Sequence, residues 1–474
     1  MKKGWELLGG LRVANVGVAL FAESLRDQDV PVVQVNWRPP AGGDRRMAGL
    51  IGRLSACDAA NDRAVERLQA ARPVWVDVGV AGEVVPGMGE RMILHAGPPV
   101  AWRRMCGPLR GAIVGAILFE GWAKDAAEAE RMGASGEVAF EPCHHHAAVG
   151  PMAGVMSPSM PVFVVENQAP AELGGGGRSY CTLNEGLGKV LRFGAYDDQV
   201  LDRLRWMAGE LAPALRAVVR VMGGLDLKSL MSRALHMGDE LHNRNVAATA
   251  TFLRVTMPHL IEAVEDRSAI VRVAAFIAGN DHFFLNLSMP AAKASLDAMA
   301  NIDGCSLVYA MTRNGTEFGI WVSGLGKRWF TAPAEIPRGL YFPGYSEKDA
   351  NPDIGDSAIM ETLGLGGSSM GAAPAIVGFV GGSAAHAVQA THEMCAIAWT
   401  RSRDYTLPYF DFAGAPMGID VRKVLETGVL PHINTGIAHR EAGVGQVGAG
   451  ILRAPEAPFR EALEALAREM GVPL

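Results

Sequence analysis

The sequence predicts a multidomain α/β protein with a Rossmann-like N-terminal parallel sheet, a central helical domain and a mixed α+β C-terminal part. Three observations support this prediction. The chain has 474 residues, 49% of them hydrophobic, which is enough for several cores. Strand-like and helical segments alternate over residues 12–122, as in a parallel sheet covered by helices. Apolar side chains recur every three or four positions over residues 187–279. We therefore expect domains at 1–180, 187–279 and 280–474.

The N-terminal domain is predicted from short β-branched runs separated by helical spacing. Strands are predicted at 13–17, 30–35, 73–79, 92–97 and 161–167, and helices at 18–26, 56–71 and 99–122. A dinucleotide-binding turn needs three glycines after the first strand, for the tight bend and for the close approach of the pyrophosphate. Only Gly17 stands there. No nicotinamide, flavin or other cofactor is therefore predicted.

The rest of the chain divides into helices and then mixed elements. Helices are predicted at 197–221, 226–241, 245–264, 269–278, 383–400 and 458–470. Residues 306–322 predict a hairpin, because Asn314-Gly315 readily takes the positive φ angles of a type I′ turn. Short strands are expected near Tyr405 and His432. Glycine-rich stretches at 364–371 and 443–450 predict loops.

Charge and cysteine content indicate in which compartment the protein works and which classes of partner it can bind. The net charge of −6, from 50 acidic and 44 basic residues, is spread along the chain, so no nucleic-acid partner is predicted. The longest apolar runs, 112–119 and 371–380, are too short to span a bilayer. The N-terminus has no signal-peptide pattern. The six cysteines are scattered, as in reduced cytoplasmic proteins. We expect a cytoplasmic protein without a membrane partner.

The segment 143–146, Cys-His-His-His, is the first candidate site and is called the histidine segment below. It lies where an apolar strand gives way to a glycine- and proline-broken loop. Imidazoles titrate near neutral pH, so the segment predicts proton transfer or anion binding. Adjacent side chains on an extended chain point to opposite sides, so at most two of the four can share a zinc ion. No metal is therefore predicted. A Cys143 nucleophile and a loop satisfied by backbone carbonyls are the alternatives.

Residues 237–245, called the polar segment below, form the second candidate site. On a helix, Glu240 shares a face with His236 and with Arg244. The inward candidates are Glu240, Asn243 and Asn245, and the alternative is a solvated helix end. Amides at other element ends can bind a carbamoyl or carboxamide group. The loop at 364–367 can hold an anion on its backbone N–H groups, although it lacks the lysine of a P-loop.

These motifs together resemble one family. Four segments are similar to the bacterial DUF1116 family. They are the run from Cys143 through Gly154, Asn184-Glu-Gly-Leu-Gly-Lys-Val, Gly238-Asp-Glu-Leu-His-Asn-Arg-Asn and Asn280-Asp-His-Phe-Phe-Leu-Asn. The resemblance runs from about residue 13 to residue 451. One branch of that family is regarded as a subunit of oxamate carbamoyltransferase in anaerobic allantoin catabolism, a branch of purine degradation and nitrogen metabolism.

The resemblance implies a reaction and partners. Oxalurate and phosphate would give oxamate and carbamoyl phosphate, with companion subunits of the acyl-CoA-synthetase-like and DUF2877 types. It supplies no established catalytic residues. We expect a homo-oligomer that binds a small-molecule substrate and phosphate. The alternatives are an amidohydrolase or lyase acting on a related ureido or cyclic amide substrate, and a non-catalytic structural subunit.

The site residues follow from this chemistry. A tetrahedral oxyanion needs hydrogen-bond donors, a carboxylate and phosphate need cations, and the leaving amide needs an acid. The residues predicted to take part in catalysis are His144, His145, His146 and Glu240. The residues predicted to bind substrate are Asn167, Asn184, Glu185, Arg192, Asn243, Arg244, Asn245, Asn280, Gly364, Gly366 and Gly367. Arg192 or Arg244 would hold the carboxylate, and all these groups would meet in one cleft.

Overall fold

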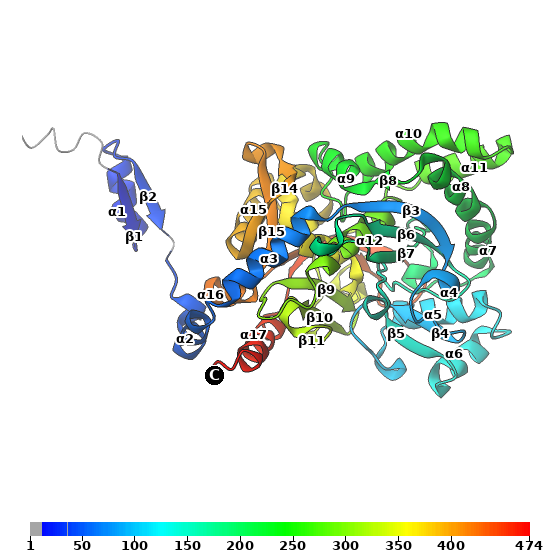
Figure 1. Cartoon of the computed structure of the whole chain (residues 1–474), viewed down its shortest axis with the longest axis horizontal. Helices are drawn as coiled ribbons and strands as arrows, with labels where there is room; N and C mark the ends of the chain where they lie inside the picture. The colour runs from blue at the N-terminus through cyan, green and yellow to red at the C-terminus, as the bar shows by residue number, and fades with distance from the viewer. Residues whose placement is uncertain (1–11, 36) are drawn as a thin grey trace, which may run out of the picture.

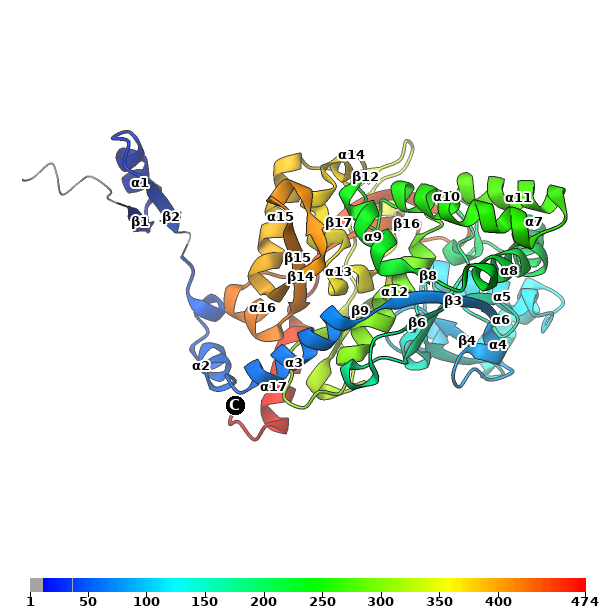
Figure 2. The same ribbon diagram turned by 45° about the horizontal axis from the view of Figure 1, so that its top comes forward.

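The computed structural model describes residues 12–35 and 37–474. Its first two strands and first helix form a small unit that lies apart from the rest (Figure 1). Strand β1 (Val13–Val16), helix α1 (Ala19–Arg26) and strand β2 (Val32–Val35) form a parallel β-α-β unit. Figure 2 shows the same separation from a second direction. Ala22 is the one fully buried side chain of this unit, while Phe21 and Val33 are more than 60% exposed. The unit therefore shares no core with the body.

The sheet that follows differs from the parallel sheet expected for residues 1–180. It has the order β7-β6-β3-β8 and is antiparallel throughout. Its strands are β3 (Pro73–Val80), β6 (Pro161–Asn167), β7 (Arg178–Thr182) and β8 (Leu225–Asp226). Among the named strands of the described residues, only β1–β2 and β4 (Met92–His95) with β5 (Ala139–Pro142) pair in parallel. The expectation of one N-terminal parallel sheet was therefore wrong, because apolar alternation marks a strand but not its partner.

Five further helices lie within the first 135 residues. They are α2 (Arg45–Arg53), α3 (Cys57–Ala70), α4 (Ala81–Val84), α5 (Gly107–Phe119) and α6 (Ala126–Ser135). Figures 1 and 2 show α3 leading from the side that carries α2, α16 and α17 into β3. Helix α5 begins later than the predicted residue 99. Cys106 is extended and Pro108 occupies the first turn, which is the position that a proline tolerates.

The helices predicted between residues 187 and 279 are present. They are α7 (Asp198–Trp206), α8 (Ala212–Met222), α9 (Leu227–His236), α10 (Val246–Ala263) and α11 (Arg267–Ala278). A π-helical turn, Met207–Leu211, joins α7 to α8. Asp197, Asp226 and Asp266 each accept a hydrogen bond from a first-turn N–H, which fixes where α7, α9 and α11 begin.

A helix that the sequence pattern did not predict lies at the centre of the body. All twelve residues of α12 (Leu285–Leu296) are buried, and the helix packs on β6 and β7. Such a helix has no polar face, so its sequence shows no amphipathic period. Near its start, Phe283 packs against Phe163 and Phe252, and Trp75 packs against the same two rings. These aromatic contacts join the helices to the antiparallel sheet.

The predicted hairpin is confirmed, although its turn differs. Strands β9 (Val308–Asn314) and β10 (Glu317–Val322) pair antiparallel within a sheet of order β11-β10-β9-β13. Strand β11 is Phe330–Pro333 and β13 is Ile354–Gly355. Gly315 has a φ of 79°, but Asn314 does not have a positive φ. The Asn314 side-chain oxygen instead accepts the N–H groups of Thr316 and Glu317, which closes the turn.

The last third contains two more sheets. One has the order β12-β17-β16 and the other pairs β14 with β15. The strands are β12 (Arg338–Tyr341), β14 (Ala398–Leu407), β15 (Ala413–Ile419), β16 (His432–Ala438) and β17 (Gln446–Arg453); the helices are α13 (Ile359–Leu363), α14 (Val377–Val380), α15 (Ala384–Ile397), α16 (Val421–Thr427) and α17 (Ala457–Glu469). Residues 443–450, expected as a loop, supply half of β17. Gly448 has no room for a Cβ, which would lie 2.4 Å from the Leu340 oxygen.

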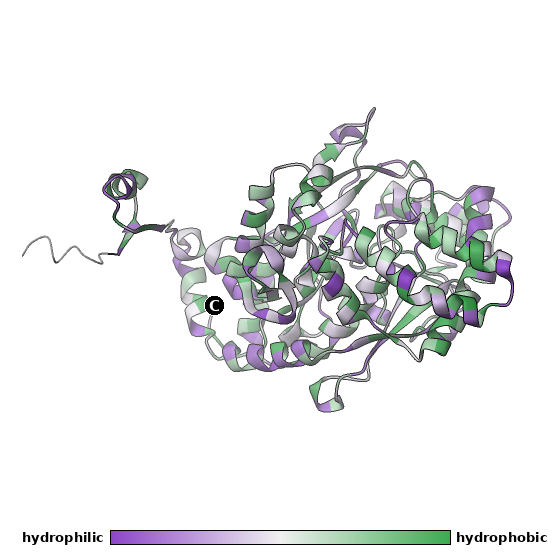
Figure 3. Ribbon diagram, turned by 90° about the horizontal axis from the view of Figure 1, so that it is seen from above, coloured by the Kyte–Doolittle hydropathy of each residue, from purple (hydrophilic) through white to green (hydrophobic). Residues whose placement is uncertain are grey.

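The body has one large apolar core and several smaller ones. The largest contains buried residues from Ala60 to Ala438 and therefore joins all three expected domains. Figure 3 shows hydrophilic and hydrophobic residues alternating along the outer helices, as expected where one helix face meets solvent. Within the described ranges, no helix combines the length and the apolar character needed to cross a bilayer.

Candidate active site

Several predicted motifs meet at a small, partly open cavity of about 30 Å³. Its wall is built from the loop after the histidine segment, the loop before α7, the polar segment, the start of α12, and strands β16 and β17. The polar residues that line it are Arg192, His242, Asn243, His282, Ser357, Thr435 and Gln446. Segments as far apart in the sequence as Pro151 and Gln446 therefore contribute side chains to one small polar space.

Arg192 brings a buried positive charge to this wall. Its side chain is about 94% buried and lies over the Phe193 ring. One guanidinium nitrogen donates to the Gly186 oxygen at 2.6 Å, whereas Nε has no hydrogen-bond partner. Burial lowers the pKa of Arg192 to about 10, against the opposing effect of the Glu185 carboxylate. The guanidinium is therefore charged at neutral pH and can bind a carboxylate.

The polar segment is a turn and not the end of a helix. Helix α9 ends at His236, and Gly238 and Leu241 both have positive φ angles. The Glu240 carboxylate accepts the backbone N–H groups of His242, Asn243 and Arg244 at 2.7, 2.7 and 2.8 Å. Burial raises the pKa of Glu240 to about 7. Glu240 therefore holds the turn that presents His242 and Asn243 to the cavity, and its own side chain does not line it.

His242 forms a buried pair with Glu361 on α13. Its Nδ1 lies 2.7 Å from Glu361 Oε1, and both side chains are at least 97% buried. Since a carboxylate accepts, Nδ1 carries the proton of this bond, and Nε2 is the nitrogen left for a ligand. The same Glu361 oxygen accepts the Gly367 N–H. A histidine oriented by a carboxylate is a common acid–base arrangement.

Unpaired polar atoms gather around this pair. The buried side-chain atoms without a hydrogen-bond partner include Arg192 Nε, Asn243 Nδ2, Asn245 Oδ1, Glu361 Oε2, and both polar atoms of Asn434. Buried polar groups are normally paired, because an unpaired group costs about 1–3 kcal/mol. Two of these atoms, Arg192 Nε and Asn243 Nδ2, belong to residues that line the cavity, which favours a site for a small polar ligand.

His282 lines the cavity, and three amides lie behind it. Asn184 donates to the His282 carbonyl at 2.9 Å and to the Asn286 side chain at 2.7 Å, and it accepts from Asn280. Burial lowers the pKa of His282 to about 3, with Arg192 and His242 contributing in the same direction. The predicted residues Asn184 and Asn280 therefore lie behind the wall, where they position a neutral His282.

The histidine segment lies outside the cavity lining. His144 is fully buried and packs edge-on against both Trp321 and Trp329, which contact each other, and neither of its ring nitrogens has a hydrogen-bond partner. Burial lowers the pKa of His144 well below its ordinary value, so the ring is neutral. Its Nε2 lies 3.6 Å from Asp356 Oδ1. The carboxylate of Asp356 accepts hydrogen bonds from other segments, and the next residue, Ser357, lines the cavity.

The other two histidines of the segment have defined partners. His145 Nδ1 donates to Glu141 at 3.0 Å, and its Nε2 accepts from the Trp329 indole at 2.9 Å. His146 donates to the Pro86 carbonyl at 2.7 Å. The 143–146 segment is a 3₁₀ turn and not an extended strand. The single cleft expected to join it to the polar segment is therefore not formed. A catalytic role for these histidines stays a prediction.

The remaining predicted residues support nearby loops. The Asn167 oxygen accepts the N–H groups of Arg72 and Ala169. Asn245 donates to the His242 carbonyl, and Arg244 donates to the Gly238 carbonyl.

The glycine loop after α13 packs against the polar segment. Gly366 and Gly367 donate their N–H groups to the Glu240 carbonyl and to Glu361, so these donors are already used. Gly364 has a φ of 108° and packs against the Pro416 carbonyl. The loop therefore holds the His242–Glu361 pair from behind. In the part of the chain that the structure describes, no three His, Cys, Asp or Glu side chains gather to hold a metal ion.

Comparison with known proteins places this arrangement in a family. The family model described as "Oxamate carbamoyltransferase subunit AllG" matches residues 138–357. The oxamate carbamoyltransferase subunit AllG of Escherichia coli K12 is 51% identical over 416 residues, which is 87% of this chain and 98% of that protein. The chain belongs to the oxamate carbamoyltransferase subunit AllG family. The uncharacterized protein YahG of the same strain is 42% identical over 98% of both chains.

A solved structure has the same fold. The crystal structure of a conserved protein of unknown function from Enterococcus faecalis V583 matches with a TM-score of 0.85 and 47% sequence identity, over 87% of this chain and 98% of that one. The residues matched by the AllG family include the histidine segment, Arg192, His242 and His282. Thr435 and Gln446 lie beyond the matched residues, although they close the cavity.

Sequence reasoning missed several residues of the cavity wall. His242 and His282 both stand inside the predicted motifs, but an assumed helix through residue 241 directed attention to Glu240 and Arg244. Gly238 was the available signal, because a glycine just past a helix commonly ends it in the left-handed conformation. Nothing in the sequence pattern singled out Ser357, Thr435 or Gln446, which reach the cavity through tertiary structure alone.

Proposed function

We propose that this chain is a subunit of an oxamate carbamoyltransferase complex and that the small polar cavity binds the carbamoylated acid. Family membership supports the class of reaction. The observation that carries the proposal for the site is that a buried guanidinium, Arg192, faces the same cavity as the His242 imidazole and the Asn243 amide. An oxalurate-like acid offers a carboxylate and amide groups to these partners.

Binding follows from complementary groups. The substrate carboxylate would replace the Gly186 carbonyl as the partner of Arg192 and would also meet the unpaired Nε. The amide of Asn243 and the side chain of Gln446 would pair with the carbamoyl and amide groups. Burial strengthens each of these contacts because water is excluded.

The chemistry requires that one proton be moved from phosphate to the leaving nitrogen, and it requires no protein nucleophile. A phosphate oxygen attacks the carbamoyl carbon and forms a new C–O bond, and the C–N bond to the oxamate-like amide then breaks. His242 Nε2 takes the proton from hydrogen phosphate and passes it to the leaving nitrogen. Glu361 stabilises the imidazolium between the two steps. Asn243 Nδ2 donates to the oxyanion of the tetrahedral intermediate. The rival assignment gives the acid role to the histidine segment.

The cavity must open for the substrate to enter. A space of about 30 Å³ holds about one water molecule. Leu187 is the wall residue most open to solvent, at 48% exposure. It lies between Gly186 and Gly188, which have φ angles of 98° and 86°. Movement of this short segment would free the Arg192 guanidinium and admit the acid in a single step.

The assembly belongs to the same proposal. Companion subunits of the acyl-CoA-synthetase-like and DUF2877 types follow from the resemblance in sequence. A homo-oligomeric arrangement is proposed with them, and a cytoplasmic location rests on the scattered cysteines. The proposed physiological setting is anaerobic allantoin catabolism.

Reconstitution tests the proposed function. The chain is combined with the products of neighbouring genes, and carbamoyl phosphate formed from oxalurate and phosphate is measured. We expect activity that depends on this chain and falls about 10³-fold with Arg192→Ala. Full activity in a complex that lacks this chain would overturn the proposal. If activity needs the chain but is unchanged by Arg192→Ala, the reaction takes place at another site.

A further inference from the structure

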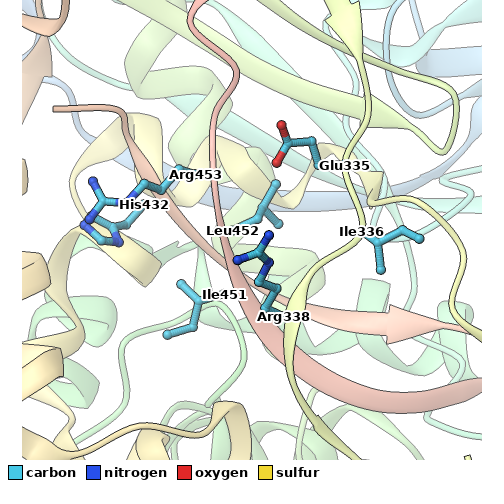
Figure 4. A pocket seen from close by; sticks show the side chains of 7 residues that line it. All are labelled: Glu335, Ile336, Arg338, His432, Ile451, Leu452 and Arg453. Atoms are coloured by element: carbon cyan, nitrogen blue, oxygen red, sulfur yellow. The ribbon is translucent and has the colours of Figure 1, made fainter. Parts of the chain in front are cut away.

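A second hollow lies at the other end of β17 from the candidate cavity. Strand β17 begins at Gln446 in the cavity wall and ends at Arg453 beside this hollow. Two adjoining pockets, with volumes of about 420 and 590 Å³, share Arg338, His432, Ile451 and Arg453. We call them the rear groove (Figure 4). Small-molecule sites commonly enclose about 300–1,000 Å³, so the rear groove has the size of a ligand site.

The rear groove has an apolar lining. Ile336, Leu340, Val380 and Ile451 line it, and Leu340 is 47% exposed. Val380 and Ile451 continue the small core between α15 and the β12-β17-β16 sheet. An apolar ligand group placed here would remove these side chains from water, which is favourable by roughly 25 cal/mol per Å².

One carboxylate in the rear groove already has partners. Glu393 on α15 accepts from His432 Nε2 at 2.8 Å and from Arg453 at 2.7 Å. Burial would raise the pKa of Glu393, but the hydrogen bonds from His432, Gln389 and Arg453 outweigh it and lower that pKa to about 2. Glu393 is therefore ionised at neutral pH. Its charge is balanced by cationic and imidazole donors of the same wall.

Arg338 is the cation that remains. No carboxylate of residues 12–35 and 37–474 lies within ion-pair distance of its guanidinium. Figure 4 shows the guanidinium near Leu452, with the Glu335 carboxylate beyond Leu452 in this view; all three residues line the pocket. Arg338 can therefore bind one anionic group, while Glu335 repels a second negative charge at the same place.

We propose that the rear groove binds a small organic monocarboxylate, with the carboxylate on Arg338 and the apolar part against Leu340 and Ile451. This site is separate from the cavity of the proposed carbamoyl transfer. A monocarboxylate fits better than a phosphate ester because Glu335 disfavours a dianion. Arg453 supplies a second cation near the ligand while one of its nitrogens stays on Glu393.

Calorimetric titration of the full-length chain tests this site with defined probes. Benzoate combines an apolar ring with one carboxylate, benzyl alcohol removes the charge, and phenyl phosphate doubles it. We expect benzoate to bind in the millimolar range and the other two probes about tenfold more weakly. Equal binding of benzyl alcohol, equal or tighter binding of phenyl phosphate, or no binding of benzoate at about 10 mM would each overturn the proposal.

Three variants make the test specific. Arg338→Ala should weaken benzoate binding about tenfold, whereas Arg403→Ala, an exposed arginine on β14, should leave it unchanged. Glu335→Gln should tighten phenyl phosphate by about threefold, because the repulsion is removed. Unchanged benzoate affinity in Arg338→Ala would exclude this groove as the binding site. Far-ultraviolet circular dichroism would check that each variant is folded.

Discussion

The histidine segment and the polar segment both gather titratable groups inside the body, but their surroundings differ. His144 packs edge-on against two indole rings without a hydrogen-bond partner, and His145 has both ring nitrogens engaged. His242 has one nitrogen held by Glu361 and belongs to the cavity wall. The difference teaches that the number of imidazoles is a poor guide to a proton-transfer site. A better guide is a ring with one nitrogen hydrogen-bonded to the protein and the other nitrogen left for a ligand.

The largest effect is expected at Arg192, the cation beside the polar segment. Arg192→Ala should lower kcat/KM of the reconstituted complex about 10³-fold, because it removes the carboxylate partner and leaves Glu185 without its neighbouring charge. Steady-state kinetics with oxalurate and phosphate would measure this. Arg205→Ala, an exposed arginine on α7, is the matched control and should keep full activity. A loss equal to that of Arg192→Ala in this control would show a general effect on assembly.

The next effect separates the two histidine-bearing regions directly. His242→Gln should lower kcat about 10²-fold and change the pH profile, since proton transfer is lost. Glu361→Gln should share this defect, and the double variant should be little worse than either single one, because the two residues act as a unit. His259→Gln on α10 is the control. Strictly additive losses from His242→Gln and Glu361→Gln would contradict a functional pair.

A smaller effect concerns stability and its dependence on pH. The pKa of Glu240 is raised in the folded state to about 7, so the folded protein binds this proton more tightly than the unfolded chain does. Its contribution is present below about pH 4.5 and is lost as pH rises through 7, by roughly 3 kcal/mol at most. Urea unfolding at pH 5 and pH 8 should show this fall in the wild type. Glu240→Gln should flatten it, and an unchanged pH dependence in the variant would refute the assignment.

The smallest effect on activity is expected in the histidine segment. His145→Ala should keep activity within about threefold of the wild type, while the free energy of unfolding falls by about 1–2 kcal/mol through loss of the Trp329 hydrogen bond and the Trp321 stack. A loss of activity as large as that of His242→Gln would reverse the comparison. It would give the acid role to the histidine segment.

Local periodicity predicted many elements but not how they assemble. Helices such as α10 and α17 show an apolar stripe because one face meets solvent, and their positions were predicted within two residues. Helix α12 is buried all round and therefore carries no such stripe. The pairing of β3 with β6 depends on a contact between residues almost 90 positions apart, about which a local pattern says nothing.

The candidate site was predictable to the extent that its chemistry stands in short motifs. Arg192 and Asn243 were predicted and line the cavity. Glu240 was predicted as a catalytic residue from helical spacing, yet its carboxylate holds backbone N–H groups of a non-helical turn. Thr435 and Gln446 have ordinary sequence surroundings. They belong to the wall because β16 and β17 pair beside it.

The isolated β-α-β unit at residues 13–35 has a thermodynamic consequence. Two strands and one helix with a single buried alanine have little cohesion of their own, and no apolar cluster of the body includes them. Heating would melt this unit in a transition separate from that of the body. A protease that cuts within residues 37–44 would therefore release this unit while leaving the candidate cavity and the rear groove intact.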